Sequence, residues 1–475
     1  MAGLAFLEKK NTVARPGYSK WLIPPAALCV HLSIGQVYAF SVFKASLVQR
    51  FESSQTAVAW IFSIAIVMLG LSAAVLGTWV ERNGPRKAMV AAGLCWSTGF
   101  LVGSLGIAIG SLPLLYLGYG VIGGIGLGIG YISPVSTLIK WFPDKPGLAT
   151  GMAIMGFGGG ALIASPLSTL LLGTFDPGFD PANTDNGASA SALASTFLTL
   201  GLVYLVFMMI GAALIRLPPG FEDDATAAHQ PGRNGALVRA KQAIRTPQFA
   251  LLWVVLFCNV TAGIGILEQA APMIQDFFRD GQDSSVSAAE AAGFVGMLSL
   301  ANMAGRFVWS SLSDRIGRKP IYMMYLGVGL VLYVLLATIG QQSTAVFVVL
   351  ALVIISYYGG GFATVPAYLK DLFGTLEVGA IHGRLLTAWA AAGVMGPLIV
   401  NGFLDAAGEP GSLVASDYHP ALITMVVVLA VGFVANLLVK PVDEKHFDQD
   451  ALSTHAERSS GAGRSGEPAT SGGTR

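Results

Sequence analysis

The chain has 475 residues, of which 53% are hydrophobic and only 12% charged, and its formal net charge is +1. Soluble domains average about 25% charged residues, so this chain cannot cover a water-facing surface, and its near-neutral charge gives no support for nucleic-acid binding. Runs of about 20 apolar residues, each long enough to span hydrocarbon as a helix, recur from end to end. The composition therefore predicts an all-α, multi-pass protein embedded in the lipid bilayer.

The apolar runs predict a chain of two repeated parts. A basic N-terminal tail (1–20) is followed by one six-helix half (21–217), a polar linker (218–246), a second six-helix half (247–440) and a Ser/Gly-rich tail (441–475) that we expect to be largely disordered. The first apolar run has the length of a full span and no small-residue cleavage site, so we interpret it as a retained helix. The twelve expected spans lie near 21–43, 57–80, 88–110, 113–139, 148–172, 195–217, 248–274, 289–312, 320–341, 344–369, 379–404 and 419–439.

Lysine and arginine predict the orientation of the chain. With the N-terminus inside, 24 of the 28 basic residues fall in cytoplasmic segments. Positive charge stays on the cytoplasmic side of a membrane. We therefore expect a plasma (cell inner) membrane protein with both termini in the cytoplasm.

A charged turn occurs twice, after the second and after the eighth span. The copies read ERNGPRK (81–87) and DRIGRK (314–319). Glycine permits a tight reversal, the acid can lie against a neighbouring helix N-terminus, and the arginines can bind the facing half. Two copies at matching positions predict a two-fold repeat with an inner gate made of Glu81, Arg82, Arg86, Asp314, Arg315 and Arg318.

This turn is the loop signature of the major facilitator superfamily, which the chain resembles over essentially all twelve spans. Three stretches, Gly35–Phe43, Gly126–Ala161 and Tyr358–Pro397, resemble the oxalate/formate antiporter (OFA) family, to which monocarboxylate transporters are related. The resemblance implies twelve helices in two pseudo-symmetric halves around a central cavity. It also implies transport of a small carboxylate without a cofactor.

One cation, Arg306, lies among the apolar residues of the eighth span. An arginine at a helix centre costs about 2.5–3.5 kcal/mol to insert, so it should face a polar cavity or a partner. Asn302 lies one turn earlier on the same face, and a guanidinium beside an amide suits a carboxylate. An ion pair with Asp314, or a snorkel to the cytoplasmic face, is the structural alternative. The resemblance implies that Arg306 is the anion site.

The number of buried cations bears on the substrate. The oxalate transporter of the resembled family has a second cation in its eleventh helix, and the matching position here is Trp389. One cation balances a monoanion but leaves a dianion half uncompensated, which is costly in a buried site. We therefore expect a monocarboxylate such as lactate, pyruvate or formate. Trp389 either closes the cavity or has an ordinary packing role.

Several tyrosines fall within spans that line the cavity in the resembled superfamily. Tyr38, Tyr131, Tyr357 and Tyr358 offer hydroxyl groups that can orient a substrate in an apolar pocket. Each of them is as well suited to packing.

Two titratable residues within spans are candidates for proton coupling. His31 can exchange a proton near neutral pH, or it can be a hydrogen-bonded packing residue. Glu268 can couple protons or simply reach the outer interface. His382 and Arg384 begin the eleventh span, where we expect interfacial anchoring.

These observations predict a secondary active transporter that moves a monocarboxylate by proton symport or anion exchange through alternating access. We expect a protein that is not an enzyme, because the spans contain no nucleophile motif or metal-ligand spacing. The sequence also lacks a nucleotide-binding motif, which argues against ATP-driven transport. We expect the protein to be a monomer. An oxalate/formate antiporter is the first alternative. A carboxylate sensor that signals through its tail is the second.

Overall fold

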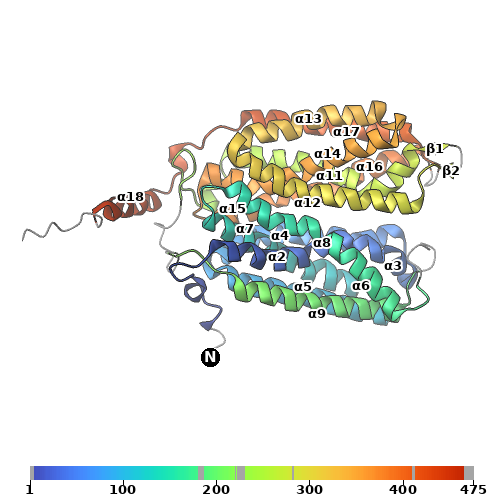
Figure 1. Cartoon of the computed structure of the whole chain (residues 1–475), viewed down its shortest axis with the longest axis horizontal. Helices are drawn as coiled ribbons and strands as arrows, with labels where there is room; N and C mark the ends of the chain where they lie inside the picture. Colours follow the sequence, from blue (N-terminus) through green and yellow to red (C-terminus); the bar gives the residue numbers. More distant parts are fainter. Residues whose placement is uncertain are drawn as a thin grey trace, which may run out of the picture.

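The computed structural model describes residues 5–179, 187–219, 221, 230–280, 283–408 and 412–464. Within these residues, twelve helices are long and apolar enough to cross a membrane. They form two groups of six that lie side by side (Figure 1). The predicted all-α architecture of two six-helix halves is confirmed.

The N-terminal half starts with a continuous helical segment, Lys20–Phe51, that continues further than the predicted end of the first span. Its elements, and those that follow up to the linker, are α2 (Ile23–Ile34), α3 (Lys44–Phe51), α4 (Gln55–Asn83), α5 (Pro85–Ile109), α6 (Leu112–Leu115), α7 (Gly124–Trp141), α8 (Pro146–Phe175) and α9 (Ala190–Leu214).

The C-terminal half repeats this order after a short linker helix, α10 (Ala240–Ala243). Its eleventh span is divided into two helices. The elements are α11 (Pro247–Phe277), the two-residue strands β1 (Arg279–Asp280) and β2 (Asp283–Ser284), α12 (Ala288–Ile316), α13 (Arg318–Ile339), α14 (Thr344–Phe373), α15 (Val378–Leu385), α16 (Thr387–Ala407) and α17 (His419–Leu438).

Two spans of the N-terminal half depart from α-helical geometry. The first span is a 3₁₀ helix over Gly35–Phe43, and the fourth is a π helix over Tyr116–Gly123. Gly35 contacts α8 so closely that a Cβ atom there would lie 2.4 Å from the carbonyl oxygen of Phe157. The backbones of the first and fifth spans therefore cross at a point that holds Phe157 in place.

Figure 1 places the N-terminus, α15 and α18 at one end of the bundle, and β1 and β2 at the other. We call the first of these the basic end, because it also carries both charged turns. The glycines of the two turns, Gly84 and Gly317, have φ values of 84° and 96°. Only glycine adopts this conformation at little cost, so the predicted tight reversals are confirmed.

The halves meet through two pairs of spans related by the repeat. The fifth span, α8, packs against α12, and the eleventh, formed by α15 and α16, packs against α4. Glycines allow this approach: a Cβ atom at Gly147 would lie 2.1 Å from the carbonyl oxygen of Ser310.

The C-terminal tail differs from the expected disorder. It forms α18 (Gln449–Arg464) and docks at the basic end, where Ala451 is buried against Leu237. An ion pair joins Asp448 to Arg239 of the linker. These contacts join the start of α18 to the linker, and residues 465–475 lie outside the described residues.

Candidate functional site

Arg306 lies in α12, ten residues before the helix ends at Ile316, which places it about 15 Å from the basic end. This distance equals half the thickness of a typical hydrocarbon core, which is about 30 Å. The side chain is fully buried, so it does not snorkel to either surface.

The guanidinium of Arg306 is held by both halves of the protein. Its Nε donates to Asn302 Oδ1 at 2.9 Å, and its Nη1 donates to the backbone oxygen of Ile154 in α8 at 3.4 Å. The ring centres of Phe157 in α8 and Phe362 in α14 lie 5.6 and 5.3 Å from its central carbon. Two aromatic faces and one amide therefore position the charged group at the interface of the halves.

The charge of Arg306 has no counter-ion in the part of the chain that the structure describes. Among the described residues no carboxylate lies within ion-pair distance of it, and its Nη2 has no hydrogen-bond partner. The alternative of an ion pair with Asp314 is therefore wrong. A buried donor without a partner costs several kcal/mol when it is charged. The arrangement is suited to accept an anion.

Aromatic side chains surround this group and include further unpaired donors. The ring of Tyr131 in α7 lies 5.3 Å from Phe157 and 5.6 Å from Trp389 of α16, and Trp389 lies 4.5 Å from Phe362. Tyr131 Oη and Trp389 Nε1 are buried without a partner in the part of the chain that the structure describes. The cluster thus brings together five spans, with apolar walls and three donor groups that have no partner among the described residues, one of them on Arg306.

The other predicted tyrosines divide into two groups. Tyr38 is half-buried, its hydroxyl lies 3.2 Å from that of Tyr358, and its ring packs on Phe157. These two tyrosines border the cluster. Tyr357 instead packs on Trp309 and Tyr325 and makes no ring contact with the cluster among the described residues.

His31 stacks on Tyr131 and bonds to two backbone oxygens. Its Nδ1 lies 2.5 Å from Ala153 O, and its Nε2 lies 3.1 Å from Tyr131 O. It therefore ties the first span to the fourth and the fifth, as a packing histidine would. A neutral imidazole donates only one hydrogen bond, so the position of its proton decides which of the two carbonyl oxygens accepts from it.

Glu268 lies far from this cluster, toward the end that carries β1 and β2. It is exposed and accepts a hydrogen bond from Asn401 at 3.3 Å. This geometry matches the outer-interface alternative.

His382 was expected at the surface, but the structure buries it to 1% exposure. Its ring lies 5.8 Å from that of Tyr131, and neither ring nitrogen has a partner among the described residues. Because α15 packs against α4 and α7, a residue near the start of the eleventh span faces the interior. The flanking sequence GAIHGRLL is mostly small and apolar, and that signal indicates burial.

At the basic end, Glu81 of the first charged turn reaches the other half of the protein. Its Oε1 accepts from the backbone N–H of Gly379, in the first turn of α15, at 3.0 Å. Its Oε2 pairs with Lys140 of α7 at 2.5 Å. The carboxylate thus caps a helix N-terminus across the interface, where negative charge is favoured.

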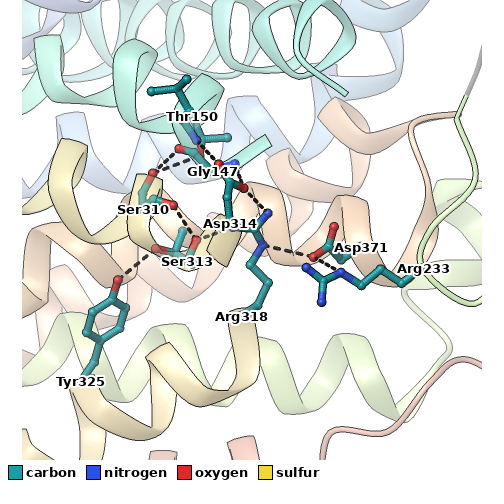
Figure 2. A network of polar contacts seen from close by, with 11 residues as sticks. Gly147, Thr150, Arg233, Ser310, Ser313, Asp314, Arg318, Tyr325 and Asp371 are labelled. Atoms are coloured by element: carbon teal, nitrogen blue, oxygen red, sulfur yellow. Dashed lines mark hydrogen bonds and ion pairs between the residues drawn. The ribbon is translucent and has the colours of Figure 1, made fainter. Parts of the chain in front are cut away.

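Asp314 of the second turn makes the equivalent contact (Figure 2). Its carboxylate accepts from the backbone N–H groups of Gly147 and Leu148, at the start of α8, both at 2.8 Å. Arg318 donates to Asp314 at 2.6 Å and to Asp371 of α14 at 3.1 Å. The two acids therefore close the basic end at symmetry-related positions.

The predicted gate arginines do not cross between the halves. Arg86 is buried in its own half, where it donates to the backbone oxygens of Phe6 and Asn11. Arg318 stays within the C-terminal half, and Arg82 and Arg315 are exposed. Helix N-termini supply the positive ends of the inter-half contacts instead.

Comparison with known proteins agrees with this architecture. The family profile of the Major Facilitator Superfamily matches residues 26–397. The chain is 26% identical to an uncharacterised MFS-type transporter, YhjX, of Escherichia coli (strain K12), over 77% of this chain and 83% of the relative. It is 25% identical to the oxalate:formate antiporter of Oxalobacter formigenes, over 78% and 81%. It is 24% identical to the apicoplast pyruvate carrier 1 of Toxoplasma gondii, over 70% and 67%.

Among solved structures, the transporter FucP in its outward conformation superposes with a TM-score of 0.65. The match covers 89% of this chain and all of FucP at 15% sequence identity, so it supports the fold alone. From the family profile, the helix order and the repeated turn together, the chain belongs to the Major Facilitator Superfamily of membrane transporters.

Proposed function

We propose that this transporter carries a small monocarboxylate, whose carboxylate binds to Arg306. The observation that carries the proposal is the buried guanidinium with a free Nη2 and no counter-ion among the described residues. A planar fork with unused N–H groups suits a carboxylate, and intramembrane ionisable residues are functional sites by default.

The composition of the cluster supports a monoanion. Arg306 provides one positive charge, and Trp389 stands at the position where the oxalate transporter of the resembled family has a second cation. Tyr131 Oη and Trp389 Nε1 are neutral donors, suited to the second oxygen of a 2-oxo or 2-hydroxy acid. Pyruvate and lactate can therefore accept hydrogen bonds from more of these donors than formate can.

Two relatives bear names that agree with this substrate class. One is an oxalate:formate antiporter and the other a pyruvate carrier. Both names denote carriers of small carboxylates.

We infer that the basic end lies on the cytoplasmic side of the cell's inner membrane, because basic residues are enriched on that side. In the observed state Glu81 and Asp314 join the halves at that end. Alternating access then requires that both helix caps break as the halves rock, so that the Arg306 site opens inward. A single chain contains all these elements, which is consistent with a monomer.

For coupling, we choose His31 over Glu268 because it lies at the candidate site. The buried imidazole lies beside two carbonyl oxygens and stacks on Tyr131 of the candidate site. Glu268 is exposed and lies outside the cluster. We propose His31 as the proton site of a symporter, with anion exchange as the alternative mode.

The test is uptake of labelled pyruvate, lactate, formate and oxalate into proteoliposomes, with and without an inward proton gradient. The wild type is run beside Arg306→Lys, Arg306→Ala and His31→Gln, after the folding of each variant is checked. Gradient-stimulated uptake that is lost in both Arg306 variants supports the proposal. Full activity of Arg306→Ala would show that the arginine is structural.

Oxalate/formate exchange is the second candidate, favoured by the similarity to the antiporter of Oxalobacter formigenes. Uptake that requires internal formate or oxalate and ignores the proton gradient would establish it. Competition by oxalate at a concentration equal to that of pyruvate would contradict the argument from a single cation.

A further inference from the structure

A cleft of about 340 Å³ opens at the basic end, away from the Arg306 site. It lies where the turn between α12 and α13 meets the ends of α14 and α17 and the linker. Four basic side chains and one acidic side chain line it: Arg233, Arg318, Lys319, Lys440 and Asp371. Its wall therefore carries a clear excess of positive charge.

The single carboxylate does not neutralise this charge. Asp371 Oδ2 is shared by two guanidinium groups, with Arg233 Nε at 3.0 Å and Arg318 Nε at 3.1 Å. Lys319 Nζ donates to the backbone oxygens of Leu437 and Val439 at 2.7 and 2.9 Å, which places its charge at the cleft but leaves it unbalanced.

Two of the cations are available to a ligand. The side chain of Arg233 is 60% exposed and uses only one edge for Asp371. Lys440 is exposed, and within the described residues its ammonium makes no hydrogen bond or ion pair. Both can turn toward a phosphate without breaking the buried contacts of Arg318.

Apolar side chains at the rim indicate where such a phosphate comes from. Ile316 lines the cleft and is 48% exposed, and Leu437 and Leu438 at the end of α17 are 47% and 56% exposed. In a protein whose outer helix faces contact lipid, these residues meet the acyl chains. Basic pockets between helices at the cytoplasmic side bind acidic lipid headgroups.

We propose that this cleft binds the phosphate-bearing headgroup of an acidic phospholipid. The headgroup binds Arg233 and Lys440, and its chains lie along Ile316 and the end of α17. When a phosphate binds Arg233, Asp371 pairs with Arg318 alone. Arg318 also pairs with Asp314, and the carboxylate of Asp314 accepts from the first N–H groups of α8 (Figure 2). Occupancy therefore stabilises the closed contact at the basic end.

The test measures the thermal unfolding midpoint of the full-length protein in detergent, titrated with phosphatidylglycerol, phosphatidylcholine or inorganic phosphate. The double variant Arg233→Gln/Lys440→Gln is compared with Lys241→Gln/Arg245→Gln. The control removes two exposed charges from the same end of the molecule, outside the cleft.

We expect phosphatidylglycerol to raise the midpoint in the wild type and the control, and phosphatidylcholine to have little effect. In the cleft variant the half-maximal lipid concentration should rise at least about tenfold, because each basic residue near the surface contributes substantially to binding of acidic lipid. Lys440→Gln alone, which removes no hydrogen bond or ion pair among the described residues, should give a smaller shift in the same direction.

Equal responses of the cleft variant and the control would overturn the proposal. An equal shift with inorganic phosphate at matched concentration would assign the cleft to free phosphate and overturn the lipid assignment. The measurement does not use transport, so its outcome is separate from that of the proposed function.

Discussion

Asn302 Oδ1 accepts a hydrogen bond from Arg306 Nε at 2.9 Å, one turn along α12. The two residues are the polar pair of an otherwise apolar stretch, and both are buried. The amide fixes the plane of the guanidinium without neutralising it. The charge therefore stays available to a substrate, while the orientation of the fork is set by the protein.

Changing Asn302→Asp tests whether the neutrality of this partner matters. The new carboxylate would lie at ion-pair distance from Arg306 and compete with the substrate. We expect the apparent affinity for pyruvate to fall at least about tenfold near neutral pH, a change of about 1.4 kcal/mol, and to recover partly at acid pH as the aspartate protonates. Uptake kinetics in proteoliposomes at several pH values measure this.

The matched variant is Asn302→Ala, which loses the orienting bond without adding charge. It should show a smaller loss of affinity and no added pH dependence. Identical behaviour of the two variants would mean that orientation alone, and not competition for Arg306, controls binding.

Asp314→Asn tests the gate at the basic end. The amide keeps one acceptor oxygen but loses the charge that faces the first turn of α8, so the closed contact should weaken by about 1–2 kcal/mol. In a background without Cys29, Cys95 and Cys258, a cysteine at Thr150 reports opening, because that residue is buried at the interface of the halves. We expect maleimide labelling about tenfold faster.

Arg315→Gln is the control for this gate, because Arg315 belongs to the same turn but is exposed. Its labelling rate should match that of the parent. If Asp314→Asn also labels at the parental rate, the helix cap does not hold the basic end closed.

The sequence was sufficient to predict the two halves, the repeated turn and a cation at Arg306 within a span, because each depends on local signals: apolar run length, glycine spacing and residue type. The walls of the site were not predictable in this way. Phe157 and Phe362 lie in different halves, and only packing of α8 and α14 on α12 brings their rings to Arg306. Tyr357 and Tyr358 are adjacent in the chain, but Tyr357 packs on Trp309 while the hydroxyl of Tyr358 meets that of Tyr38, a difference that depends on helical phase.

The position of His382 shows the same limit, because its burial follows from the angle at which α15 enters the bundle. The two ring nitrogens of His382 have no hydrogen-bond partner among the described residues, and this leads to a prediction. Unpaired buried polar groups cost about 1–3 kcal/mol, so His382→Phe should raise the thermal unfolding midpoint by a few degrees. If the imidazole contacts the substrate beside Tyr131, the same variant should lose most of its uptake rate.

His382→Gln should retain more transport than His382→Phe, because it keeps a polar group. A more stable phenylalanine variant with wild-type uptake would show that the histidine has no part in transport.

The last prediction concerns the approach of α8 to Arg306. A Cβ atom at Gly158 would lie 2.9 Å from Arg306 Nε and 3.0 Å from its Cδ, so Gly158→Ala must displace the guanidinium. At Gly173 of the same helix, a Cβ atom meets nothing within 4 Å. Alanine favours a helix over glycine by about 1 kcal/mol, so any general effect of the substitution is stabilising at both positions. We therefore expect Gly158→Ala to reduce pyruvate affinity about tenfold and Gly173→Ala to leave it unchanged. Equal affinities would place the substrate away from the fork of Arg306, since a shift of its Nε by a few tenths of an ångström would then have no effect on binding.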